Sequence, residues 1–178
     1  MERSPVWSPD GRNIAYFSDE SGEYELHLAP QNGTGTVTKI AMPGPGFYRA
    51  PRWSPDSSKI SFVDARMRIW YLDVSTRKFT QVDKERYWAA FSEDWVPVWS
   101  PDSKSLAYSK RLANYMGAIH FYSLSDGKIT QVTDGLSDAK YPAWDSDGKY
   151  LYFAASTDSG PALEPDVGSG RPTESRSL

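Results

Sequence analysis

Short stretches in which apolar and polar residues alternate recur along the chain, and clusters of Ser, Pro, Asp and Gly separate them. A Trp-Ser-Pro-Asp sequence begins at Trp7, Trp53 and Trp99, and a related Trp-Asp-Ser-Asp sequence begins at Trp144. Alternation over short runs predicts half-buried β-strands, and Ser, Pro, Asp and Gly in this order favour a tight turn. Each copy therefore predicts a β-hairpin.

Two further strands follow the hairpin in the first three copies. The third strand is expected over 24–28, 68–72 and 118–122, and the fourth over 37–40, 79–82 and 129–132. The repeated Trp residues are separated by 46, 46 and 45 positions. Four antiparallel strands in a period of this length predict β-propeller blades. The expected fold class is therefore all-β, with about 3.5 blades per chain.

The blades are expected over about 2–43, 44–84 and 88–134, with a half-blade over 138–156, inside a partial β-propeller of residues 1–158. Closed propellers contain roughly four to eight blades, so this number leaves an incomplete ring with exposed edges. We expect either a part of a longer protein or a homo-oligomer that closes the ring, with a dimer favoured. Residues 159–178 contain repeated Gly and Pro and no strand pattern, which predicts a disordered tail.

Composition narrows the possible partners. Charged residues make up 24% of the chain and the net charge is −3, without the basic clusters of a nucleic-acid surface. No apolar run approaches the roughly 20 residues of a membrane span, so we expect a soluble protein, cytoplasmic or periplasmic, with no membrane partner. The absence of Cys and the presence of two His exclude common zinc sites, and the chain has no Gly-rich phosphate loop, so no cofactor or metal is predicted.

Catalytic chemistry has little support in the sequence. A nucleophilic Ser usually needs a His as base, and the two candidates, His27 and His120, fall in expected third strands. Gly135–Ala139 lacks the final Gly of a Gly-x-Ser-x-Gly elbow. We therefore predict no catalytic residue in this chain and interpret both histidines as strand residues satisfied by their neighbours.

Two sets of equivalent positions are candidates for packing and for binding. The repeated Trp7, Trp53, Trp99 and Trp144 are expected to pack between adjacent blades, and a ligand platform is the alternative. Four residues before each of these Trp residues lie Arg3, Arg49, Trp95 and Lys140. First strands line the channel of a propeller, so these positions, three of them basic, could attract a peptide carboxylate. The alternative is that they are solvated charges at the rim.

Several stretches resemble known propeller families. The Trp-Ser-Pro-Asp-Gly/Ser sequence followed by an aliphatic-Ala-Tyr unit resembles the WD40-like (PD40) repeat of TolB-like propellers. Residues 14–26, 99–110 and 150–158 resemble the propeller of tricorn-type peptidases, the S41 class of serine peptidases. The resemblance covers about residues 4–161. It implies a domain that precedes the catalytic part and guides or filters peptides, while the catalytic residues lie in later domains and none carries over to this chain.

Three functions are compatible with these observations. The first is a non-catalytic β-propeller segment of a tricorn-like peptidase that serves substrate access, peptide binding or assembly, with a peptide or protein as its partner. The second is a stand-alone TolB-like module that binds proteins. The third is a hydrolase whose site, built around His27 or His120, forms only on oligomerisation.

Overall fold

The computed structural model describes residues 2–87 and 95–156. Within these ranges the chain forms fourteen β-strands in four sheets, three of four strands and one of two, and neighbouring strands in each sheet are antiparallel. The prediction of an all-β fold with blades of four antiparallel strands is confirmed. The predicted tail, residues 159–178, lies outside the described residues.

Each sheet follows the order of the sequence, so every blade is a meander. Blade 1 contains β1 (Glu2–Trp7), β2 (Asn13–Ser18), β3 (Glu25–Pro30) and β4 (Thr38–Ala41). Blade 2 contains β5 (Tyr48–Trp53), β6 (Lys59–Asp64), β7 (Arg68–Asp73) and β8 (Lys78–Lys84). Blade 3 contains β9 (Val98–Trp99), β10 (Ser105–Arg111), β11 (Gly117–Ser123) and β12 (Ile129–Gln131). Blade 4 contains β13 (Asp138–Trp144) and β14 (Leu151–Ser156).

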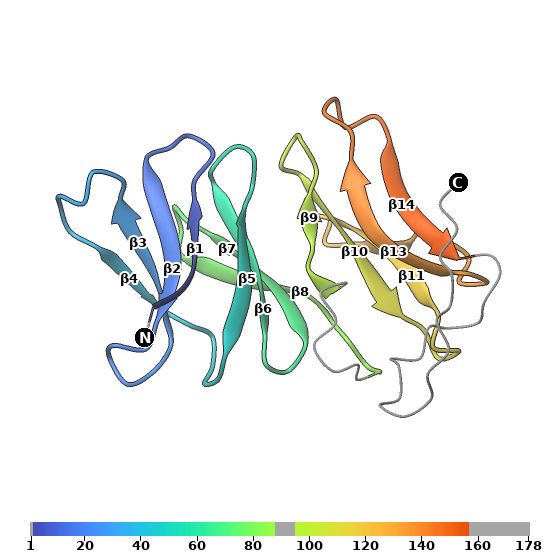
Figure 1. Ribbon diagram of the computed structural model, residues 1–178, viewed down its shortest axis with the longest axis horizontal. Coiled ribbons are helices and arrows are strands. Elements are labelled where there is room, and N and C mark those ends of the chain that lie inside the picture. Colours follow the sequence, from blue (N-terminus) through green and yellow to red (C-terminus); the bar gives the residue numbers. More distant parts are fainter. Residues whose placement is uncertain (1, 88–94, 157–178) are drawn as a thin grey trace, which may run out of the picture.

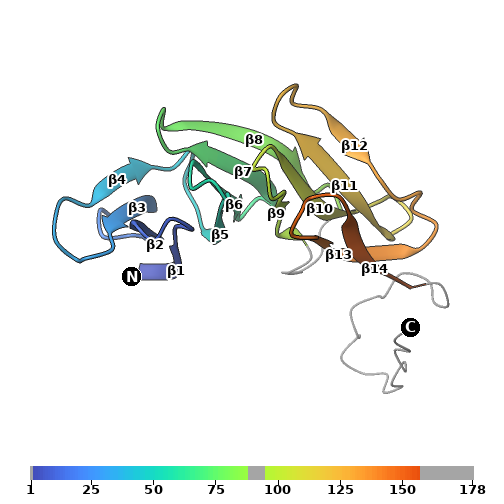
Figure 2. The ribbon, with the colours of Figure 1, turned by 90° about the horizontal axis from the view of Figure 1, so that it is seen from above.

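The blades lie side by side along an open arc (Figure 1). Figure 2 shows the fourth strands β4, β8 and β12 on one side of this arc and the first strands β1 and β5 on the other. β1 contacts β5, and β9 contacts β13, so the first strands of blades 1 and 2, and those of blades 3 and 4, lie next to each other on this inner side. Blade 1 and blade 4 occupy the two ends of the arc, and the residues that the structure describes do not close a ring.

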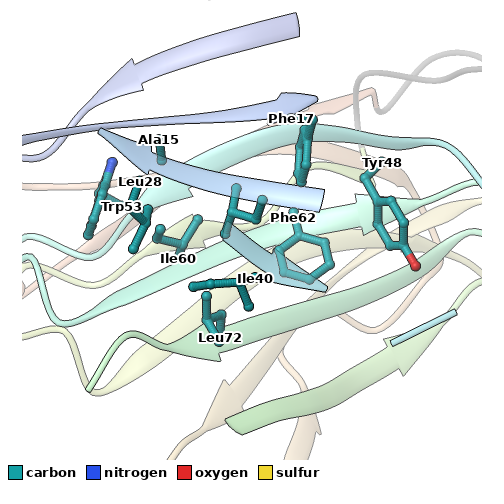
Figure 3. Packing of buried hydrophobic residues seen from close by; sticks show 10 residues of the cluster. Ala15, Phe17, Leu28, Ile40, Tyr48, Trp53, Ile60, Phe62 and Leu72 are labelled. Carbon is teal, nitrogen blue, oxygen red and sulfur yellow. The ribbon is translucent and has the colours of Figure 1, made fainter. Parts of the chain in front are cut away.

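Two apolar clusters hold neighbouring blades together. The first lies between blades 1 and 2 and is built around the fully buried Phe17 and Phe62, whose rings meet edge to face at 6.0 Å (Figure 3). The second lies between blades 2 and 3 and includes Ile69, Trp95 and Tyr108. Each large apolar side chain buried in this way contributes about 1.5–3 kcal/mol. Successive side chains of a strand point to opposite faces of the blade. Each blade therefore contributes side chains to the cluster with the blade before it and to the cluster with the blade after it.

A bulge interrupts three of the four inner strands, at the residue before a Pro. The pairing registers of β1, β5 and β13 shift beside Pro5, Pro51 and Pro142. The residues before these prolines, Ser4, Ala50 and Tyr141, have positive φ values of 53°, 52° and 56°. Pro lacks an amide donor and is tolerated where the ladder is already broken. A residue other than Gly in this left-handed region of backbone conformation costs about 1–2 kcal/mol of conformational energy.

The Ser-Pro-Asp turns are held by a repeated hydrogen-bond network. In blade 1, the Ser8 hydroxyl donates to Asp10 Oδ1 at 2.6 Å and accepts from the Asn13 amide at 2.9 Å. The same pairs recur at Ser54 with Asp56 and at Ser100 with Asp102. This network fixes the hairpin geometry at one end of the arc's inner strands.

The fourth position of the turn also joins neighbouring blades. Ser57 and Ser103 stand where blade 1 has Gly11, and both have positive φ, 60° and 62°. The Ser57 hydroxyl accepts from the Asp10 amide of blade 1 at 3.1 Å, and the Ser103 hydroxyl accepts from the Asp56 amide of blade 2 at 3.0 Å. The strain expected from Ser at this position is therefore offset by a hydrogen bond across the junction.

Candidate functional site

The two central Trp residues seal the junctions between blades. Trp53 and Trp99 are each 8% exposed. The Trp53 Nε1 donates to the Val6 carbonyl of blade 1 at 3.2 Å, and the Trp99 Nε1 donates to the Arg52 carbonyl of blade 2 at 3.1 Å. Because both indoles are used in packing and in a cross-blade hydrogen bond, they contribute to the core and leave little ring surface for a ligand.

Trp7 and Trp144 do not pack between blades in the way predicted for the repeated Trp residues. Trp7 is 58% exposed, and blade 1, which carries it, lies at one end of the described arc (Figure 1). Trp144 is half-buried and lies edge to face with Phe121 at 6.1 Å, but its buried Nε1 has no hydrogen-bond partner among the described residues. The equivalent position therefore contributes to the core only where complete blades meet.

Trp95 also differs from its expectation as a channel-lining residue. It is 2% exposed and packs edge to face on Tyr108 at 5.4 Å, inside the cluster between blades 2 and 3. The neighbouring Val96 does not share the positive φ of its counterparts, and the regular part of β9 begins only at Val98. The backbone before Trp99 therefore takes a different path from its counterparts, and the indole is a core residue.

The two arginines occupy equivalent places on neighbouring inner strands. The Arg3 guanidinium lies 5.9 Å from the centre of the Phe47 ring, a cation–π distance. The Arg49 Nη2 donates to the Met67 sulfur at 3.6 Å. Arg3 is exposed and Arg49 is half-buried. Both cations thus lie at the end of β1 and β5 remote from the Ser-Pro-Asp turns, and Arg3 also interacts electrostatically with Asp19.

Lys140 is placed differently from the arginines. Its Nζ forms an ion pair with Asp138 Oδ2 at 3.2 Å, and Asp138 is buried. The other oxygen of Asp138 accepts from the Gly117 amide of blade 3 at 2.7 Å. The lysine is therefore part of the junction between blades 3 and 4. Of the predicted ring, the structure brings only Arg3 and Arg49 together on contacting strands.

Phe47, which lies beside Arg3, and its neighbour Tyr24 were missed in the sequence analysis. Phe47 is 60% exposed and lies 5.4 Å from the ring of Tyr24. These residues belong to the loop before β5 and to the approach to β3, which are far apart in sequence. A Pro-Gly-Pro-Gly segment directly before Phe47 was the available signal, since such a segment turns the chain sharply.

The histidines lie in separate blades and are both buried. His27 is 2% exposed and its Nε2 lies 3.3 Å from Glu25 Oε2. His120 is 7% exposed, with Nδ1 3.0 Å from the Ala118 carbonyl, and burial lowers the pKa of its ring. Each packs against a Tyr, Tyr16 or Tyr108 respectively. Blade 2 lies between their blades, so the two imidazoles do not form a pair among the described residues.

A polar cluster of structural character lies between blades 2 and 3. Asp83 accepts from the Tyr108 hydroxyl at 2.8 Å and forms an ion pair with Lys110 at 2.8 Å. Burial raises the pKa of the Tyr108 hydroxyl, and the negative charge of the Asp83 carboxylate raises it further. In the described part of the chain no group of three or more His, Cys, Asp or Glu residues is placed to hold a metal ion. None of the described elements is a helix of the length and hydropathy needed to cross a membrane.

Comparison with known proteins identifies the propeller family that this chain matches. A family model for the tricorn protease second beta propeller domain matches residues 1–164. A putative tricorn-like protease C-terminal subunit of Sulfurisphaera tokodaii is 30% identical over 91 residues, 51% of this chain and 10% of the relative. A tricorn protease homolog of Saccharolobus solfataricus is 27% identical over 91 residues, 51% of this chain and 8% of the relative. This chain thus spans a small part of the relatives that it matches.

Solved structures give the same fold. The crystal structure of the tricorn protease superimposes with a TM-score of 0.74 at 23% identity, over 87% of this chain and 15% of the other. TolB from Acinetobacter baumannii superimposes with a TM-score of 0.60 at 24% identity, over 86% of this chain and 37% of the other. At these identities the likeness shows the β-propeller fold alone.

Proposed function

The chain belongs to the family of tricorn protease second β-propeller domains, and we propose that it is a non-catalytic propeller segment that binds peptides at the inner strands of blades 1 and 2. The catalytic chemistry would belong to other parts of a longer, tricorn-like peptidase. The proposal rests on Arg3 and Arg49, which stand at equivalent places on contacting strands.

The chemistry of these two side chains suits a peptide carboxylate. A guanidinium offers several N–H donors in a plane, and two of them can meet both oxygens of one carboxylate. Phe47, beside Arg3, presents an exposed ring that a peptide side chain can cover. Arg and aromatic residues are enriched at the energetic centres of protein interfaces. A peptide that ends at this surface would therefore gain both an ionic and an apolar contact.

The test compares labelled peptides with a free or an amidated C-terminus by fluorescence anisotropy. A charge-assisted hydrogen bond contributes about 1.5–3 kcal/mol, so the free carboxylate should bind about tenfold or more tighter than the amide. The double variant Arg3→Gln with Arg49→Gln should remove this preference. The matched control is Arg12→Gln, which changes an arginine, 82% exposed at its side chain, in the turn at the opposite end of β1. Equal affinity for both peptide forms in the unchanged protein would contradict the proposal.

A further inference from the structure

At each junction the Trp indole packs against the blade before it, and the same kinds of group surround the indole at successive junctions. At the junction of blades 1 and 2, the site of Trp53 consists of the Val6 carbonyl, the small Ala15 and the neighbouring Leu28. Ala15 is fully buried and pairs with Val6 across the β1–β2 ladder. Figure 3 shows Trp53 beside Ala15 and Leu28. We call this arrangement the Trp site of a blade.

The next blade repeats the same Trp site. Trp99 donates to the Arg52 carbonyl, and Ser61, which pairs with Arg52, is fully buried. Tyr71 takes the place of Leu28, with its ring 6.2 Å from that of Trp99. In both blades the residue beneath the indole is small, because a larger side chain would occupy the volume that the indole fills.

Blade 3 keeps a small residue at this position and blade 4 does not. Ala107, which pairs with Val98, is fully buried. At the same position of blade 4 stands Tyr152, which pairs with Ala143 and is 60% exposed. Forcing an additional ring into a packed junction costs about 1–3 kcal/mol or more. The outward face of blade 4 therefore offers no Trp site.

The opposite end of the arc carries the indole that such a site would receive. Trp7 is 58% exposed and pairs with Ile14, as Trp53 pairs with Ile60. The structure describes two strands of blade 4, and they correspond to β1 and β2, the strands of blade 1 that β5 contacts. With a small residue at position 152, blade 1 of a second copy could dock on β13 and β14 as β5 docks on β1 and β2. A head-to-tail contact of this kind repeats from molecule to molecule and produces rings or filaments.

We propose that Tyr152 prevents two copies of this chain from joining head to tail through blade 4 and blade 1. Because Tyr152 pairs with Ala143 as Ala15 pairs with Val6, its ring would compete with the incoming Trp7 indole for the same place. This proposal opposes the dimer expected from the number of blades, and it is independent of the peptide site. An incoming blade with a small side chain at the position of Trp7 would not clash with Tyr152.

Sedimentation velocity on the purified chain tests the proposal over a range of concentrations. The unchanged protein should sediment as a monomer, and Tyr152→Ala should associate, with at least a doubling of mass as the concentration rises. Adding Trp7→Ala to Tyr152→Ala should restore the monomer. The matched control is Tyr150→Ala, which removes a tyrosine of similar exposure, 54%, from the edge of the same hairpin and should stay monomeric.

Two results would overturn the proposal. One is an unchanged protein that already associates and becomes monomeric with Trp7→Ala, because Trp7 would then dock despite Tyr152. The other is a monomeric Tyr152→Ala variant, because the tyrosine would then not be the obstacle. Retention of the unchanged β-sheet circular dichroism spectrum by each variant establishes that the comparison is between folded proteins.

Discussion

Replacing the same residue type at two equivalent positions gives the sharpest test of the blade junctions. Trp99→Ala removes an indole that is 8% exposed, whereas Trp7→Ala removes one that is 58% exposed. A Trp side chain presents up to about 250 Å², so the difference in burial corresponds to roughly 125 Å², or about 3 kcal/mol at 25 cal/mol per Å². The lost hydrogen bond from Trp99 to the Arg52 carbonyl adds about 1 kcal/mol.

We therefore expect Trp99→Ala to lower the free energy of unfolding by about 4 kcal/mol more than Trp7→Ala does. Urea unfolding followed by far-ultraviolet circular dichroism measures both variants, because this signal reports mainly the backbone and each variant is fitted to its own folded and unfolded baselines. Equal slopes against urea are required for the comparison. Equal losses of stability in the two variants would refute the reasoning, since the exposed and the sealed indole would then be equivalent.

Two further predictions concern the turns. Ser103→Ala keeps the positive φ of this residue and removes the hydrogen bond that its hydroxyl accepts from the Asp56 amide, so it should lower the free energy of unfolding by about 1 kcal/mol. Ser57→Ala removes the equivalent bond from the exposed Asp10 amide, and thermal unfolding of both variants should show the smaller loss of stability for Ser57→Ala. The Ser100 hydroxyl and the Lys104 amide lower the pKa of Asp102 below its usual 3.8. Because the folded pKa is the lower one, the stabilisation is present above pH 3.8 and is lost as the pH falls through the folded value. Asp102→Asn should make the unfolding midpoint less sensitive to acid between pH 5 and 2, and an unchanged acid dependence would count against this assignment.

The repeat explains why so much of the fold could be predicted. Trp7, Trp53, Trp99 and Trp144 set the period, and alternation around each of them sets the strands, because both signals depend only on local sequence. The candidate site was predictable in part. Arg3 and Arg49 follow from the period, but Phe47 comes beside Arg3 only through the packing of blade 2 on blade 1.

The sequence by itself determined the strand order, the hairpin turns and the number of blades, since these follow from the spacing of Trp, Pro and Asp. Only the tertiary structure decided which equivalent residues behave alike. Trp7 and Trp99 share a motif and differ in burial, and Trp95 enters the core where its counterparts are Arg3 and Arg49. The physical reason is that burial depends on the neighbouring blade, and a local pattern contains no information about whether that neighbour is present or how closely it approaches.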